Sequence, residues 1–316
     1  MIFVSGTKRS GTSMWMQVLA AAGFAVLGKA FPRGWDKTAL RDANPGGFYE
    51  SLLRQGVYYR TNPHPKTGKY FLPEDVEGYA VKVFIPGVVR SERAYITRLV
   101  ANVRAWREYE ASIMRLYSLE DAERQEKRPD APAPVRFPPA YEWWMENFAL
   151  IRDISLRRYP ARLFAYDDLL ARSDELLPRT LAWLAEGREF DVERALAAIK
   201  PERRTQEGAR VSEEARAGLY DDETATPIDA ATAKVFDDLH AEVASSGSIS
   251  RPLLQLLNKT NRELLPRLVK MQRRVAQDEV RRRRPKRKPM GIEGLPPIGR
   301  DNTVMLGARP VEPTED

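Results

Sequence analysis

Residues 1–24 read MIFVSGTKRSGTSMWMQVLAAAGF and combine three patterns in a fixed order. Residues 2–4 form a short apolar run, which is typical of a buried strand. Residues 6–11 begin and end with glycine and are otherwise small or basic. From Thr12 onward, apolar side chains recur at helical spacing. The stretch therefore predicts a strand, a glycine-bounded loop and a helix.

Such a loop is suited to holding a phosphate group. The first N–H groups of a helix have no partner within the helix, and the helix dipole adds partial positive charge there. A nucleoside-triphosphatase loop reads G-x-x-x-x-G-K-[ST]. Gly6 and Gly11 have this spacing, but Thr12 stands where the lysine should be. Positive charge comes earlier in the loop, at Lys8 and Arg9.

The segment KRSGTS, residues 8–13, resembles the 5′-phosphosulfate loop, P-[KR]-[ST]-G-[TS]-[TS], of sulfotransferases that use 3′-phosphoadenosine 5′-phosphosulfate (PAPS). Arg9 takes the place of the family's basic residue, and Lys8 replaces the usual proline. The resemblance implies that Arg9 offsets negative charge as the bridging oxygen leaves. It also implies that the whole loop binds the phosphosulfate, through Lys8, Arg9, Ser10, Gly11, Thr12 and Ser13.

A second segment resembles the same family. Residues 96–103 predict a strand, and a helix over 106–116 follows. VRAWREYEAS, residues 103–112, is similar to the family pattern VRDPREVxAS, whose arginine and serine grip the 3′-phosphate of the cofactor. Arg104 and Ser112 match these two positions. Arginine suits this task because its planar fork meets phosphate with two hydrogen bonds.

A sulfotransferase also needs a general base that takes the proton of the acceptor. Residues 42–50, DANPGGFYE, predict a loop because Asn-Pro and Gly-Gly break regular structure. Bacterial sulfotransferase-like proteins carry a similar N-P-x-G-[FY]-[YW]-E segment, which suggests Glu50 as the base for an acceptor hydroxyl. The alternative is a loop glutamate that caps a helix or pairs with an arginine.

Residues 79–86, YAVKVFIP, predict a further strand. In the cytosolic sulfotransferases of animals the corresponding segment resembles K-[TS]-H-L-P, and its histidine is the catalytic base. Lys82 and Pro86 match that pattern, but Phe84 stands in place of the histidine. A base must therefore come from elsewhere, and Glu50 is our first choice. Lys82 either approaches the sulfuryl group or is a strand lysine whose ammonium reaches solvent.

Residues 161–170, ARLFAYDDLL, predict a strand that runs into a helix. They resemble the family segment hxYEDLL, in which the tyrosine lies beside the adenine, and Tyr166 matches it. The resemblance spans roughly residues 2–184. It implies an α/β fold, a three-layer P-loop-like domain with a central parallel sheet, and the alternation of strands and helices predicts this independently.

We expect the sulfotransferase-like domain to occupy residues 1–245, with a flexible, charged and proline-rich insertion at 118–137. Residues 250–280 predict an amphipathic C-terminal helix, kinked or split at Pro266. Its apolar stripe must pack against the body or a second copy, so a homodimer through this helix is possible. Residues 281–316 predict a disordered basic tail rich in proline and glycine.

The net charge of +7 equals the number of basic side chains in the run RRRRPKRK, residues 281–288. Without this run the remaining chain is near neutral, so we expect no general attraction for nucleic acid outside the tail. The run itself could contact anionic lipid, nucleic acid or an acidic acceptor, or remain solvated.

The chain of 316 residues contains no cysteine, which excludes disulfides, zinc–thiolate sites and a thiol nucleophile. This favours a reducing compartment, so we expect a cytoplasmic protein. The N-terminal apolar run is too interrupted for a signal peptide. No stretch approaches the ~20 apolar residues of a transmembrane segment.

The resemblance implies transfer of a sulfuryl group from PAPS, without a metal ion, to a hydroxyl or amine of a small-molecule or glycan acceptor. Two alternatives stay open. A small-molecule kinase on the same scaffold would need ATP and magnesium, and the missing lysine after Gly11 argues against it. A non-catalytic nucleotide- or polyanion-binding protein would act through the leucine-rich helix and the basic tail.

Overall fold

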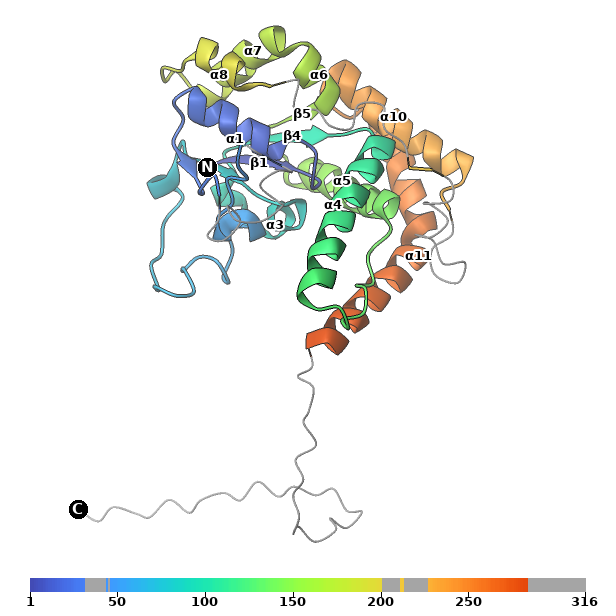
Figure 1. Ribbon diagram of the computed structural model, residues 1–316. Coiled ribbons are helices and arrows are strands. Elements are labelled where there is room, and N and C mark those ends of the chain that lie inside the picture. Colours follow the sequence, from blue (N-terminus) through green and yellow to red (C-terminus); the bar gives the residue numbers. More distant parts are fainter. Residues whose placement is uncertain (32–43, 45, 201–210, 213–226, 284–316) are drawn as a thin grey trace, which may run out of the picture.

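The computed structural model describes residues 1–31, 44, 46–200, 211–212 and 227–283 (Figure 1). Its centre is a five-stranded sheet in the order β2-β3-β1-β4-β5, in which every pairing is parallel. The strands are β1 (Ile2–Gly6), β2 (Val26–Leu27), β3 (Ala80–Lys82), β4 (Arg98–Val103) and β5 (Ala161–Ala165).

Helices cover both faces of this sheet, as Figure 1 shows. One face carries α1 (Thr12–Ala21), α7 (Ser173–Ala185) and α8 (Val192–Ala198). The other face carries α3 (Ile85–Arg90), α4 (Trp106–Lys127), α5 (Pro139–Arg157), α10 (Ala230–Ser246) and α11 (Arg251–Arg283). The short elements are α6 (Tyr166–Ala171) and the 3-10 turns η2 (Leu52–Gln55), η3 (Glu74–Val76) and η4 (Arg93–Tyr95).

Strand β1 shows how the sequence produces the three layers. Successive side chains of a strand point to opposite faces of the sheet. Accordingly, Phe3 packs into the core cluster on the α4–α5 side, whereas Ile2 and Val4 pack into the cluster beneath α1. A central parallel strand is buried on both faces and reads as a continuous apolar run. The predicted three-layer α/β fold is confirmed.

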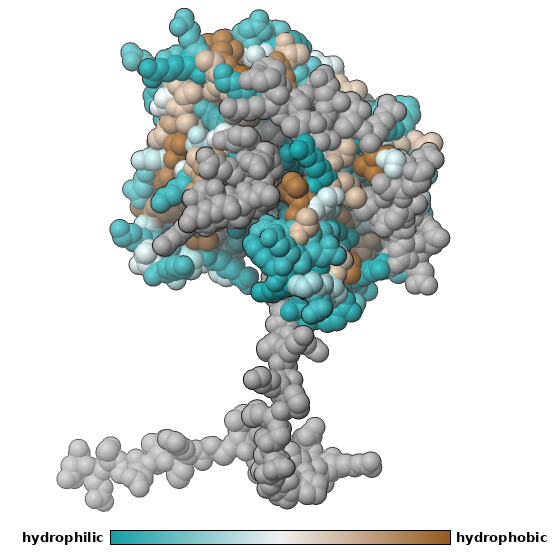
Figure 2. Space-filling model, in the orientation of Figure 1, coloured by the Kyte–Doolittle hydropathy of each residue, from teal (hydrophilic) through white to brown (hydrophobic). Residues whose placement is uncertain are grey.

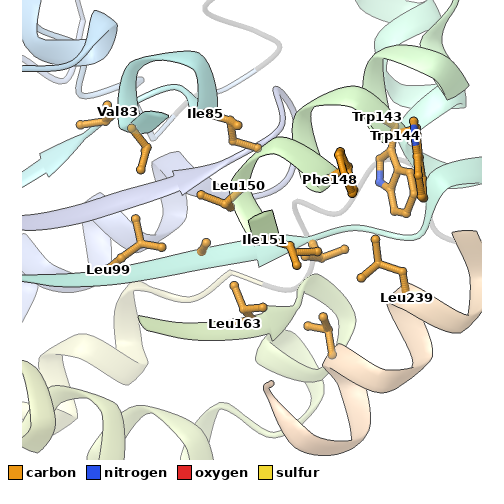
Figure 3. Close-up of a cluster of buried hydrophobic side chains, with 14 of the residues drawn as sticks. Val83, Ile85, Leu99, Trp143, Trp144, Phe148, Leu150, Ile151, Leu163 and Leu239 are labelled. Carbon is orange, nitrogen blue, oxygen red and sulfur yellow. The ribbon is translucent and has the colours of Figure 1, made fainter. Parts of the chain in front are cut away.

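The larger core lies between β4, β5, α5 and α10 (Figure 3). Trp144 stacks on Phe236 of α10, with ring centroids 4.9 Å apart and planes 9° from parallel. Its neighbour Trp143 is fully buried and donates a hydrogen bond from Nε1 to the carbonyl oxygen of Arg104 at 2.8 Å. The aromatic cluster of α5 is therefore core, and it also fixes the backbone at the end of β4.

Two expectations about regular structure in the sheet domain need correction. The strand predicted over residues 79–86 ends at Lys82, because Pro86 lies in the first turn of α3, where proline needs no N–H partner. The insertion predicted at 118–137 begins as helix, since α4 continues to Lys127. Its residues favour helix, and an ion pair between Lys127 and Glu123, four residues apart, supports the last turn.

The C-terminal helix α11 is continuous through Pro266 and extends to Arg283, so the predicted split is wrong and the basic run begins as helix. Leu257, Leu264 and Leu268 join the same core cluster as the sheet. The body of this chain thus covers the apolar side of α11. The homodimer was suggested because the apolar stripe needed a partner, and the body of the same chain provides that partner. The tail from residue 284 onward lies outside the described residues.

Candidate functional site

The loop after β1 turns sharply into α1 at Gly11. Gly11 has φ 91°, in the left-handed region, and precedes the first residue of the helix. A Cβ atom on Gly11 would lie 2.6 Å from the Tyr166 ring and 2.9 Å from Nδ2 of Asn102. Only glycine combines this backbone conformation with this close approach. The glycine therefore lets the loop lie directly against the ends of β4 and β5.

We expect Gly11→Ala to destabilise the protein by more than Gly23→Ala. Gly23 also has a left-handed backbone, φ 93°, but no atom lies within 4 Å of its Cβ position. The control should cost about 1–2 kcal/mol for the backbone alone, and Gly11→Ala should add about 1–3 kcal/mol for the clash. Urea unfolding measures both. Equal losses would contradict the close packing of the loop.

Asn102 of β4 supports this loop by a hydrogen bond to the backbone of Ser10. This residue was not identified from the sequence. Its side chain is fully buried, donates from Nδ2 to the carbonyl oxygen of Ser10 at 2.9 Å, and accepts from Nε1 of Trp15 at 2.7 Å. A buried amide needs such partners. The available signal was an asparagine inside an otherwise apolar strand.

Arg104 follows β4 and reaches the loop. Its Nη1 donates to the carbonyl oxygen of Arg9 at 3.0 Å, and its guanidinium carbon lies 5.0 Å from the centroid of the Tyr166 ring. Glu108, one helical turn later, accepts from its Nη2 at 3.3 Å. The structure thus brings together three residues that the sequence placed in one nucleotide site: Arg9, Arg104 and Tyr166.

Arg9 has a left-handed backbone, φ 65°, and its Nε donates to Oγ of Ser112 at 3.2 Å. Ser112 is 2% exposed and lies beneath Arg9. Burial lowers the pKa of Arg9, and the positive charge of Arg104 lowers it further. Two guanidinium groups close to each other create a local surplus of positive charge, which an anion would relieve.

Ser10 differs from the rest of the loop. Its hydroxyl donates to the carbonyl oxygen of Thr7 at 2.7 Å, and the residue is fully buried. Ser10 therefore shapes the loop from inside, whereas its neighbours Arg9, Thr12 and Ser13 line the pocket.

Glu50 and Lys82 form a buried ion pair on the other side of the loop. Nζ of Lys82 lies 3.2 Å from Oε1 of Glu50 and donates to Oγ of Ser13 at 3.2 Å. Oε2 of Glu50 accepts from Nη1 of Arg54 at 2.7 Å. The side chains of Glu50 and Lys82 are each only 6% exposed. Lys82 thus lies beside the loop between β1 and α1, and the predicted alternative of a Glu50–arginine pair is present as well.

Burial lowers the pKa of Lys82, and the Glu50 carboxylate opposes that effect. The rings of Phe48 and Phe84 lie 6.0 and 5.9 Å from Nζ of Lys82. Phe84, which replaces the histidine of the animal pattern, thus flanks the ammonium group instead of supplying a base.

The loop, Arg104, Tyr166 and the Glu50–Lys82 pair line one pocket of about 470 Å³ at the carboxyl edge of the sheet. Ser10, Asn102 and Ser112 are buried and do not line it. The chain leaves β1 for α1 on one face and leaves β4 for α4 on the other. Ligands of open α/β sheets bind at the crevice that such a reversal creates. Among the residues that the structure describes, six basic residues and two carboxylates line the pocket, namely Lys8, Arg9, Arg54, Lys82, Arg104 and Lys200, and Glu50 and Glu120.

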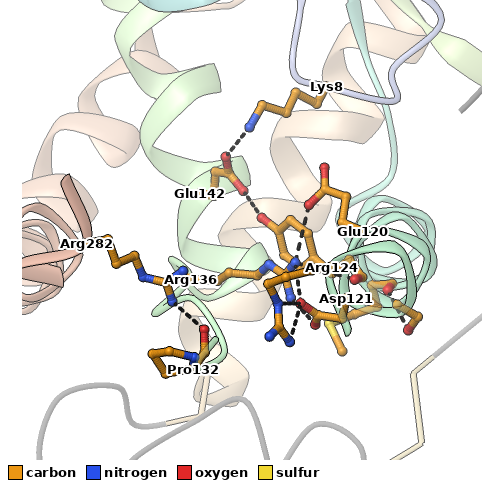
Figure 4. Close-up of polar contacts among 11 residues, drawn as sticks. Lys8, Glu120, Asp121, Arg124, Pro132, Arg136, Glu142 and Arg282 are labelled. Atoms are coloured by element: carbon orange, nitrogen blue, oxygen red, sulfur yellow. Dashed lines mark hydrogen bonds and ion pairs between the residues drawn. The ribbon is translucent and has the colours of Figure 1, made fainter. Parts of the chain in front are cut away.

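Lys8, in the position of the family's proline, connects the loop to α5 (Figure 4). Its Nζ lies 3.6 Å from Oε1 of Glu142, whose Oε2 accepts from the hydroxyl of Tyr117 at 3.2 Å. Tyr117 and Glu120 of α4 line the same pocket, and Arg136 binds Glu120 at 3.3 Å. The segment between α4 and α5 thus supports the rim of the pocket through Arg136.

Beneath this rim, burial and the nearby charge of Glu142 raise the pKa of Glu146 to about 8. The folded state therefore holds a proton that the unfolded chain releases, and stability should fall as the pH rises from about 5 to 8. Glu146→Gln should abolish this fall and raise stability at pH 8 by a few kcal/mol. Urea unfolding across this range tests it, with exposed Glu193→Gln as the control. A fall that persists in Glu146→Gln would contradict the assignment.

The described residues also place Lys200, beyond the end of α8, at the pocket. No group of three His, Asp or Glu residues among the described residues could hold a metal ion. Nor does the described part of the chain contain a helix with the length and apolarity needed to cross a membrane.

No protein-family model matches this chain, and no curated protein matches it. The interpretation of the pocket therefore depends on its own geometry and chemistry.

Proposed function

We propose that this protein is a sulfotransferase that moves a sulfuryl group from PAPS to a hydroxyl or amine of a small-molecule or glycan acceptor. One observation carries the proposal. The phosphate loop after β1 and Arg104 after β4 are in direct contact at one pocket, with Arg104 Nη1 3.0 Å from the carbonyl oxygen of Arg9. A ligand with two separate anionic groups joined by adenosine fits this arrangement.

The pocket chemistry supports a PAPS site. Its volume is within the range of small-molecule sites. The N-terminus of α1 and the side chains of Arg9 and Ser13 would hold the phosphosulfate. Arg104 would meet the 3′-phosphate, and the Tyr166 ring would lie against the adenine. Ser112 would act through Arg9 and not bind the 3′-phosphate directly, because it accepts from Arg9 Nε and does not line the pocket.

The transfer would form a bond between the acceptor oxygen or nitrogen and sulfur while the bond from sulfur to the bridging oxygen breaks. The electron pair goes to 3′-phosphoadenosine 5′-phosphate (PAP), and the acceptor proton goes to Glu50. Lys82 lies between Glu50 and Ser13, where its positive charge would stabilise the departing oxygen. Arg9 would offset charge from the loop side.

The direct test is turnover. Purified protein is incubated with PAPS and pools of hydroxyl and amine acceptors, and PAP and sulfated products are measured by mass spectrometry. The proposal expects acceptor-dependent PAP formation without added metal. Parallel reactions contain ATP and magnesium, and acceptor-dependent ADP without any PAP would favour the small-molecule kinase instead. No binding of PAPS or PAP at all would exclude the sulfotransferase.

A further inference from the structure

Helix α11 carries a large surplus of positive charge on its solvent side. Residues 251–282 contain nine Lys or Arg residues and three Asp or Glu residues. At 3.6 residues per turn, seven of the basic residues project within an arc of about 140°. One acidic residue, Glu263, projects within the same arc and pairs with Lys259 at 4.0 Å, so the arc keeps a large positive surplus. We call this surface the cationic face; it consists of Lys259, Arg262, Arg267, Lys270, Arg273, Arg274 and Arg281, all exposed.

The core fixes the orientation of this face. Leu257, Leu264 and Leu268 project from the other side of α11 and are buried in the main core cluster. The helix therefore cannot turn its basic residues inward without exposing these leucines. It runs along the outer edge of the molecule (Figure 1). From Lys259 to Arg281 the face extends about 33 Å along the helix axis.

Exposed aliphatic side chains lie among the basic residues. Leu256 is 37% exposed and Val280 is 56% exposed, and both project within the same arc as the cationic face. Helix α11 contains no aromatic residue that could stack on a nucleic-acid base. A membrane interface offers anionic headgroups and, just beneath them, apolar acyl chains. Amphipathic helices bind to both. Nucleic acid and acidic glycans offer no comparable partner for exposed leucine and valine.

The C-terminal end of α11 is fixed to the rest of the protein. Figure 2 shows hydrophilic side chains gathered where α4 and this end of α11 meet. Asp278 there is 6% exposed, accepts from the backbone N–H of Val135 at 3.0 Å, and pairs with Arg281 and Arg282. These contacts hold the end of α11 against the segment that follows α4.

We propose that the cationic face of α11 binds the surface of an anionic lipid membrane, with the helix parallel to the bilayer plane. The attraction comes from the lipid headgroups, and Leu256 and Val280 enter the interface. This inference is independent of sulfuryl transfer, because none of these residues lines the pocket.

Cosedimentation of the full chain with vesicles tests the proposal. The protein should bind phosphatidylcholine vesicles that contain phosphatidylserine, should not bind pure phosphatidylcholine, and should release as salt screens the charges. A triple variant, Arg262→Gln, Arg267→Gln and Arg273→Gln, should lose about 100-fold in partition, since each cation near such a surface contributes about fivefold.

The matched control removes three exposed arginines from the opposite face of the sheet: Arg172→Gln, Arg179→Gln and Arg194→Gln. Its net charge is identical, so it should bind as the unchanged protein does, and circular dichroism confirms folding of both. Equal loss in the two variants, or no binding of the unchanged protein to anionic vesicles at low salt, overturns the proposal.

A deletion of residues 284–316 separates the helix from the tail. Binding that persists in the deletion and still depends on Arg262, Arg267 and Arg273 supports the cationic face. Binding that disappears with the tail alone overturns it. Tighter binding to duplex nucleic acid than to the mixed vesicles, lost in the same triple variant, would assign the face to nucleic acid instead.

Discussion

Replacing Arg104 with alanine is expected to weaken the binding of PAP by about 100-fold or more, because it removes a buried, charged donor from the site. Arg104 is only 5% exposed, and it joins the phosphate loop to the end of β4 through its bond to the carbonyl oxygen of Arg9. Isothermal titration calorimetry with PAP measures the loss directly.

Two variants make this result specific. Arg104→Lys keeps the charge but loses the planar fork, so its affinity should lie between those of the unchanged protein and Arg104→Ala. Arg107→Ala removes a more exposed arginine that pairs with Asp237 outside the pocket, and PAP binding should not change. Unchanged affinity in folded Arg104→Ala would remove Arg104 from the nucleotide site.

The second large effect is expected on turnover. Glu50→Gln should lower kcat by about 100-fold or more, the usual contribution of a general base. PAP affinity should change far less, because Glu50 lies on the β3 side of the loop, bonded to Lys82 and Arg54. Steady-state kinetics with PAPS and an identified acceptor, together with calorimetry, separate the two quantities.

Glu120→Gln serves as the control, since Glu120 is a second carboxylate that lines the pocket and binds Arg136 at its rim. This variant should keep most of its turnover. Full activity in Glu50→Gln would leave Glu50 as the ion-pair partner of Lys82 and Arg54 and would require another base.

The parts that sequence predicted well are those set by local spacing. The apolar run, the glycines and the helical periodicity of residues 1–24 fix β1, the loop and α1 within a short segment. Arg104 was assigned to the nucleotide site because its segment resembles the family pattern for the 3′-phosphate. The structure shows that β4 is parallel to β1, so Arg104 lies at the same edge of the sheet as the loop.

The parts that sequence missed depend on contacts between distant segments. Asn102 supports Ser10 and Trp15 across 92 and 87 residues of chain. The local strand pattern around Asn102 does not predict contacts with Ser10 and Trp15. The helix over residues 118–127 was missed for another reason, since its charged composition resembles a loop although its propensity favours helix.

The distribution of charge also depends on the structure. The chain without residues 281–288 is near neutral, from which we expected no general attraction for nucleic acid outside the tail. A neutral total does not exclude a charged surface, because acidic and basic side chains can lie on different sides of the molecule. The packing of Leu257, Leu264 and Leu268 orients α11 so that its basic residues form one exposed face. The sequence predicted a covered apolar side of this helix, and the structure shows that the body of the same chain covers it.

In the proposed complex, one ligand with two phosphates spans the loop and Arg104. Calorimetry of the intact protein with PAP, compared with adenosine 5′-monophosphate, measures this directly. We expect saturable heat and a raised melting temperature with PAP, and much weaker binding of the monophosphate. Equal affinity for both nucleotides, or no heat and no thermal protection with well-folded protein, would contradict it.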